Sequence, residues 1–167
     1  LPHDIAFFNI YKVKSDAHTL FSALSRTYKD FISTEKNPFE TETSYQFTVP
    51  LDEEKMNEAA QILFDFKDFT SFSRLHTDVK TNNCNIFTAK WSRDRSRLFF
   101  TIKADRFLRN MVRAIVGTLI EVGKGKLTTN GFRKVIEKKN RAAAGTSAPA
   151  RGLFLTDIEY PENIKID

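Results

Sequence analysis

The spacing of apolar side chains changes from a period of two to a helical period near residue 105. Asn85–Arg93 and Leu98–Ala104 alternate apolar and polar residues and are joined by a short polar turn, which predicts a β-hairpin. The inward faces of the two strands are expected to hold Phe87, Ala89 and Trp91, and Leu98, Phe100 and Ile102. Arg106–Val122 then has the apolar stripe of a helix, with Gly123 at its end. A hairpin that leads directly into a helix indicates an α+β fold.

The other segments extend this pattern along the whole chain. Asp52 is a suitable N-cap for a helix with Met56, Ala59, Ala60 and Leu63 on one face. A further helix is expected over Asn130–Lys139. Further strands are expected over Ile5–Val13, Leu20–Ile32, Ser44–Val49 and Gly152–Tyr160. The resulting order, β-β-β-α-β-β-α-α-β, predicts one α+β domain over residues 1–167, in which helices cover one face of a mostly antiparallel sheet.

Composition excludes several classes of protein. No run of apolar residues approaches the roughly 20 of a membrane span, so we expect no membrane association. The single cysteine, Cys84, excludes an internal disulfide and a zinc site built on several thiolates. No secretory signal opens the sequence, which favours the cytoplasm. Because the first residue is Leu1 and not Met, the chain is compatible with part of a longer protein.

Positive charge is concentrated in the C-terminal part of the chain. Residues 105–151 contain eleven Lys or Arg against three acids, a net charge of +8, whereas the whole chain carries +5. Such asymmetry is typical of a protein that binds a phosphate-rich partner, although a solvated, solubilising surface has the same appearance.

Three arginines are spaced along the predicted helix Arg106–Val122. Arg106, Arg109 and Arg113 follow one another at i, i+3 and i+7, which would align three guanidinium groups on one helix face, with Lys124 and Lys126 just beyond. Guanidinium groups bind phosphates with two parallel hydrogen bonds, but an ordinary solvated face is the alternative. Arg113 lies beside the apolar stripe, and a half-buried Arg needs a carboxylate or phosphate partner.

The remaining reactive residues give weaker signals. Most of the 16 Phe alternate along strands and are expected in the core, whereas Phe69 and Phe72 flank a polar pair in a loop and are candidates for a pocket wall. Common nucleotide-binding and nucleophile motifs are absent, and a catalytic role for Cys84 is not expected. The histidines, which lack metal-ligand spacing, are His3, His18 and His76. Reasoning from the residues alone ends at a basic α+β domain suited to nucleic acid.

Five blocks of the chain resemble a known family. Residues 107–117, FLRNMVRAIVG, followed by EVGKG at 121–125, are similar to the Phe-x-x-x-Met-Val-Arg-x-(Ile/Leu)-Val-Gly block of the tRNA pseudouridine synthase A family. The other blocks, in family order, are LPHDI at 1–5, FSALSRTY at 21–28, DFTSF at 68–72, and AAGTSAPARGLFL at 143–155, which is followed by Tyr160-Pro161. Together the blocks span essentially the whole chain.

This resemblance implies an activity and roles for residues. The family isomerises uridine to pseudouridine in the anticodon arm of tRNA, without cofactor or metal, as a homodimer with a cleft between two α+β halves. An aspartate attacks the flipped nucleoside. By resemblance, Tyr28 stacks on the target base and Arg113 pairs with the catalytic aspartate, while Leu153 forms an apolar wall of the pocket. The substrate-binding set is then Tyr28, Phe72, Arg106, Arg109, Lys124, Lys126 and Leu153.

The departures from the family pattern matter equally. The nucleophile's motif, Gly-Arg-Thr-Asp-Ala-Gly, is absent from these 167 residues, and His76-Thr77-Asp78 lacks its glycines. We therefore expect a C-terminal half that is inactive alone. Leu20 stands where the family usually has Arg, and Asp30 where an aromatic residue is common. The alternatives are a non-catalytic RNA-binding module and a dimerisation domain with a Phe-rich sheet face.

Overall fold

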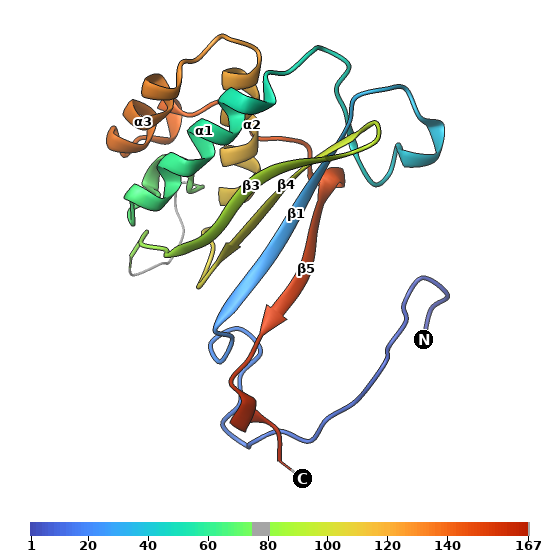
Figure 1. Ribbon diagram of the computed structural model, residues 1–167. Coiled ribbons are helices and arrows are strands. Elements are labelled where there is room, and N and C mark those ends of the chain that lie inside the picture. Colours follow the sequence, from blue (N-terminus) through green and yellow to red (C-terminus); the bar gives the residue numbers. More distant parts are fainter. Residues whose placement is uncertain (75–80, 167) are drawn as a thin grey trace.

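The fold is a five-stranded sheet covered on one face by helices (Figure 1). It was obtained as a computed structural model in which residues 1–74 and 81–166 are described. The strands are β1 (Ser25–Ser33), β2 (Tyr45–Gln46), β3 (Ile86–Asp94), β4 (Arg97–Ala104) and β5 (Leu153–Glu159). The order β2-β1-β4-β3 is completed by β5, which pairs with β1. Pairing is antiparallel except between β1 and β2, so the prediction of a mostly antiparallel sheet is confirmed.

Three α-helices of the described residues pack on the same face of the sheet. They are α1 (Glu53–Gln61), α2 (Met111–Gly123) and α3 (Thr129–Glu137). Asp52 caps α1 as predicted, because its side chain accepts a hydrogen bond from Lys55 N at 3.0 Å. Short 3-10 helices occupy Pro38–Glu40, Ile62–Asp65, Thr70–Phe72, Arg141–Ala143, Ala150–Gly152 and Glu162–Ile164.

The core lies between this helical layer and the sheet. Every second residue of β4 is buried, and Trp91 of β3 packs on Phe100 with ring centroids 5.0 Å apart. The predicted inward face of the hairpin is confirmed except at Phe87, which is exposed. A register shift between Ile86 and Thr88 places Phe87 at an irregularity in the pairing, and this turns its side chain outward.

The helix expected over Arg106–Val122 begins only at Met111. Asn110 adopts the left-handed conformation, with φ of 68°, which a helix cannot pass through. Asparagine tolerates this conformation better than most residues. Arg106 and Arg109 therefore precede the helix, and the predicted alignment of three arginines on one helix face is wrong.

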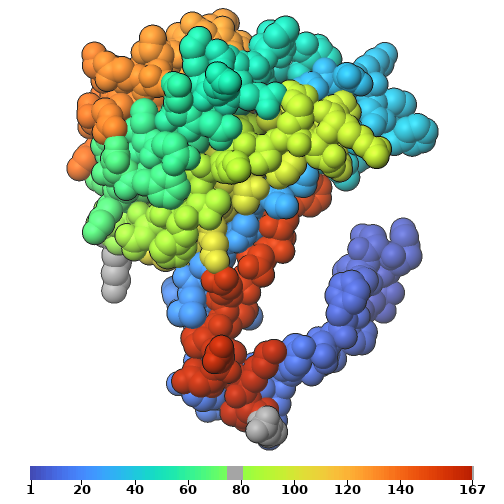
Figure 2. All heavy atoms as spheres, in the orientation of Figure 1, coloured from blue at the N-terminus to red at the C-terminus, as the bar shows by residue number. Residues whose placement is uncertain are grey.

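The strand expected over Ile5–Val13 does not form. The segment is irregular and exposed, and its one bridge joins Val13 to Lys165. In Figure 2 the N-terminal segment stands clear of the packed body and meets it near the C-terminus. Two other strands are shorter than predicted, because β1 starts at Ser25 and β2 contains only two residues.

The described residues lack two kinds of feature. No helix among them is both long and apolar enough to cross a membrane. Within the same residues, no group of three or more His, Cys, Asp or Glu side chains is arranged to hold a metal ion.

Candidate active site

The alternation of β1 determines which of its side chains face the helices. Tyr28 is paired with Ile102 of β4 and Asp30 with Phe100, and both partners are buried in the core. Residues directly opposite each other in an antiparallel pair share a face of the sheet. Tyr28, Asp30 and Ile32 therefore line the helix-covered face of the sheet.

Tyr28 lies where the helical layer ends. It is half-buried, and its ring meets the ring of Phe107 edge to face, with centroids 5.2 Å apart. This arrangement is favourable for two aromatic rings and holds Tyr28 in one orientation. On β5, the residue paired with Tyr28 is Leu155, which remains 46% exposed. The ring of Tyr28 is thus supported on one side, beside an apolar surface that solvent reaches.

Arg113 is held in the first turn of α2 by the loop that leads to β5. Its Nε donates a hydrogen bond to the carbonyl oxygen of Ala148 at 2.6 Å, and its own carbonyl accepts one from Ala148 N at 2.9 Å. The side chain is half-buried, as the sequence suggested. Its two terminal nitrogens form no hydrogen bond or ion pair with residues 1–74 or 81–166. The anchored guanidinium therefore has donors available for an anion.

The loop that anchors Arg113 is itself fixed to α2. Gly117 lets the loop approach closely, because a Cβ there would lie 1.8 Å from the Thr146 carbonyl oxygen. Gly145 N donates to Thr118 Oγ1 at 3.0 Å, and Asn110 Nδ2 donates to Ser147 Oγ at 2.7 Å. These contacts determine where the Ala148 carbonyl lies, and they thereby position the Arg113 side chain.

Asp30 carries a carboxyl group in an unusual environment. Its side chain is fully buried, and neither carboxylate oxygen has a hydrogen-bond partner in the described part of the chain. Burial raises the pKa of Asp30 from 3.8 to about 7, although the positive charge of Arg113 acts in the opposite direction. Gly152 makes room for it, since a Cβ there would lie 2.8 Å from Asp30 Oδ1.

Leu153 completes the cluster from the edge strand. It is paired with Asp30 across β1 and β5, is half-buried and packs against the core. The structure thus brings together residues from three distant segments of the sequence: Tyr28 and Asp30 of β1, Arg113 of α2 and Leu153 of β5.

Several predicted substrate-binding residues lie elsewhere. Lys124 and Lys126 follow the C-terminus of α2, about 20 Å along the helix axis from its start. Lys124 forms an ion pair with Glu121 at 2.7 Å. Arg106 and Arg109 lie in the irregular segment before α2, close to Phe107 in the sequence. The structure therefore divides the predicted basic set between the two ends of one helix.

Phe69 and Phe72, which the sequence made candidates for a pocket wall, lie in the core of the described residues. Both rings are fully buried, and Phe72 stacks on Phe132 of α3 with centroids 6.0 Å apart. In the described residues these rings belong to the core, because Phe69 precedes and Phe72 ends the 3-10 helix Thr70–Phe72, which packs against α3.

The other reactive residues have structural surroundings. Cys84 is buried, which raises its pKa to about 11 and disfavours the reactive thiolate. His18 accepts hydrogen bonds from the backbone of Leu20 and Phe21, as a structural residue does. His76 and the sequence His76-Thr77-Asp78 lie outside the described residues.

Sequence reasoning gave no place in the site to Asp30 or to two residues that contact the cluster, Phe107 and Ala148. Asp30 was noted only as a departure from the family, yet it is a charged residue at an inward position between Tyr28 and Ile32, which period-two alternation reveals. Phe107 and Ala148 gave no comparable signal, because one contributes a ring edge and the other a backbone carbonyl.

Comparisons with known proteins show the family to which the chain belongs. A family model described as tRNA pseudouridine synthase matches residues 59–161, more than half of the chain. The chain belongs to this family. It is 58% identical over 164 residues to tRNA pseudouridine synthase A of Parabacteroides distasonis, covering 98% of this chain and 65% of that protein. It is 38% identical to the protein of the same name from Bacillus pumilus over 162 residues, covering 96% of this chain and 66% of that protein. The chain thus spans just under two thirds of the length of these relatives.

Proposed function

We propose that this chain supplies the Tyr28–Arg113 part of the active site of an enzyme that isomerises uridine to pseudouridine in the anticodon arm of tRNA. The observation that carries the proposal is the anchored guanidinium of Arg113, whose terminal N–H groups are free within the described residues. Such a group suits the ionised nucleophilic aspartate, since a neighbouring positive charge favours the charged form of a carboxyl group.

The other residues of the cluster have complementary roles in this reaction. The target uridine must leave the base stack before an enzyme can reach its glycosidic bond. The ring of Tyr28, supported by Phe107, stacks on the flipped base. The apolar wall is formed by Leu153 and extended by the exposed side chain of Leu155. Phe107 thus belongs to the support of the pocket.

The nucleophile is provided from outside these 167 residues, because the family's aspartate motif is absent from them. We infer that the chain alone is inactive. A direct test joins it to the part of the Parabacteroides distasonis protein that it does not cover. Tritium release from C5-labelled uridine in an anticodon-arm tRNA is then measured for the chain and for the chimera.

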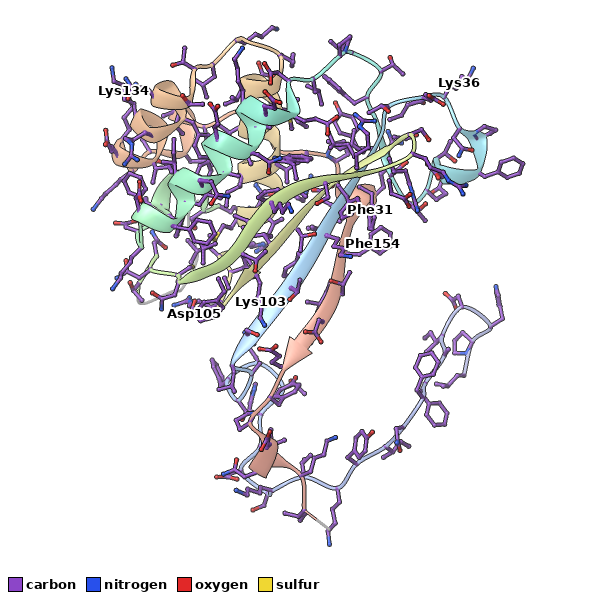
Figure 3. All side chains as sticks on the ribbon, viewed as in Figure 1. Phe31, Lys36, Lys103, Asp105, Lys134 and Phe154 are labelled. Carbon is purple, nitrogen blue, oxygen red and sulfur yellow. The ribbon has the colours of Figure 1, made fainter. Side chains whose placement is uncertain are left out.

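We expect release by the chimera alone. Release by the isolated chain would show that its own residues include the nucleophile, and would contradict the proposal. In the chimera, Arg113→Ala should abolish turnover and leave tRNA binding largely intact. Lys134→Ala, which removes the positive charge of an exposed side chain on α3, is the matched control and should retain turnover (Figure 3).

A non-catalytic RNA-binding module is the second candidate, favoured by the net charge of +8 on residues 105–151. Inactivity of both proteins, together with RNA binding that weakens steeply with salt, would support this candidate. We also propose that the complete enzyme is a homodimer, which sedimentation of the chimera without RNA tests.

A further inference from the structure

The buried carboxyl group of Asp30 is not explained by the roles proposed above. It lies at the centre of the sheet, between Phe100 of β4 and Leu153 of β5. Both of its oxygens lack partners among the described residues, although buried polar groups in proteins are nearly always hydrogen-bonded. A buried group of this kind without a partner indicates either strain or a function.

Arg113 is the charged group that acts on Asp30 from the helical layer. No ion pair within 4.0 Å joins the two side chains, and the guanidinium is held by the Ala148 carbonyl oxygen instead. The residues that strand pairing and the close approach of Gly152 place beside Asp30 carry no charge: Phe100, Leu153 and Gly152.

We propose that Asp30 is a positioning residue that competes, in its ionised form, with the catalytic aspartate for the guanidinium of Arg113. This inference rests on the proposed function. When Asp30 carries its proton, the terminal N–H groups of Arg113 are free for the nucleophile. When Asp30 loses the proton to water, the buried negative charge attracts the same N–H groups toward the sheet.

The balance between these states falls in an accessible pH range. Burial brings the pKa of Asp30 to about 7 in this chain. A docked nucleophilic carboxylate adds a second negative charge, which raises the pKa further. Activity is therefore expected to fall above neutral pH, by roughly tenfold for each pH unit beyond the midpoint. Asp30 then makes the activity of the enzyme sensitive to pH. An aromatic residue, which is common at this position in the family, would not have this effect.

The first test needs no activity. The Asp30 carboxyl carbon and the Arg113 side-chain nitrogens are followed by NMR in the 167-residue chain as the pH is raised. We expect one shared midpoint near 7, and a higher midpoint in Arg113→Gln, because a cation that lowers the pKa has been removed. The charge-matched control, Lys134→Gln, should leave the midpoint unchanged. An Arg113 signal that does not respond to Asp30 ionisation would overturn the proposal.

The second test measures the pH dependence of turnover in the chimera. Asp30→Asn keeps the shape of the side chain but carries no charge, so its activity should not fall above neutral pH. Wild-type activity should drop by roughly tenfold per pH unit over the same range. An unchanged fall in the variant would overturn the competition. If the wild-type chimera is inactive, the proposed function fails, and the NMR result still decides whether Asp30 and Arg113 are coupled.

Discussion

Two segments of nearly the same composition have opposite positions in this protein. Residues 5–13, IAFFNIYKV, are irregular and exposed, whereas residues 98–104, LFFTIKA, form a central strand with alternate side chains buried. Phe8 is 96% exposed and Phe100 is 0% exposed. Strand propensity is the same in both segments, so the difference shows that paired strands and a covering helical layer decide burial.

The largest effect on stability is expected when the side chain of Phe100 is truncated. Phe100→Ala removes a ring that packs on Trp91 between sheet and helices and leaves a cavity. We expect a loss of about 4 kcal/mol in the free energy of unfolding, measured by urea titration. A loss below about 1 kcal/mol would mean that the core is loosely packed.

The next effect concerns the contact between α2 and the loop that anchors Arg113. In Gly117→Ala the new methyl group overlaps the Thr146 carbonyl oxygen, which belongs to the backbone and cannot turn aside. We expect a loss of roughly 3 kcal/mol, with a changed Arg113 side-chain signal in NMR. Gly125→Ala is the control, because it has open space and only the strain of a φ of +70°, worth about 1 kcal/mol.

A third prediction concerns how stability depends on pH. The pKa of Asp30 is about 7 in the folded chain and near 4 when unfolded, so between these values the folded state holds a proton that the unfolded state has lost. The contribution of Asp30 to the free energy of unfolding is fully present below pH 4 and is lost as the pH rises to about 7. We expect the free energy of unfolding to decrease by roughly 2 kcal/mol between pH 4 and pH 7. This is less than the full shift of the pKa would give, because the protein around a buried charge relaxes.

Asp30→Asn should remove this pH dependence. Asp4→Asn, a charge-matched change in the exposed N-terminal segment, should leave the dependence as it is in wild type. Thermal unfolding at a series of pH values measures both. A wild-type stability that is constant from pH 4 to 7 would contradict the elevated pKa.

The smallest effect is expected at Phe8. Phe8→Ala removes a ring that is almost fully exposed, so it should change the free energy of unfolding of this chain by less than about 0.5 kcal/mol. The same urea titration as for Phe100 gives the comparison directly. A loss comparable to that at Phe100 would mean that the N-terminal segment packs against the body in solution.

The face of the sheet opposite the helices is the one that the dimerisation hypothesis concerns, because it carries Phe side chains. Phe31 and Phe154 lie side by side on this face, with ring centroids 5.8 Å apart (Figure 3). Lys29 lies over the ring of Phe99 and Arg97 over the ring of Phe31, so cations partly cover this face. Alternation along β1 and β5 predicts which side chains lie on it.

Sequence reasoning worked where local rules decide the structure. The hairpin of β3 and β4, the Asp52 cap of α1 and the α+β class all follow from alternation, capping and helical spacing. It failed at Asn110, where a left-handed residue delays α2, and over residues 5–13, where no partner strand is present among the described residues. Both failures concern interactions with residues that are distant in the sequence or conformations that local propensity does not specify.

The sequence by itself determined the hairpin, the three helices to within a few residues, the basic segment and the family resemblance, because these depend on residue type and spacing. Only the tertiary structure decided that Arg113 is anchored by the Ala148 carbonyl, that Phe72 belongs to the core, and that Asp30 is buried within reach of the Arg113 charge. Burial and charge proximity are properties of neighbours in space. Residues 30, 113 and 148 become neighbours only when β1, α2 and the loop before β5 pack together.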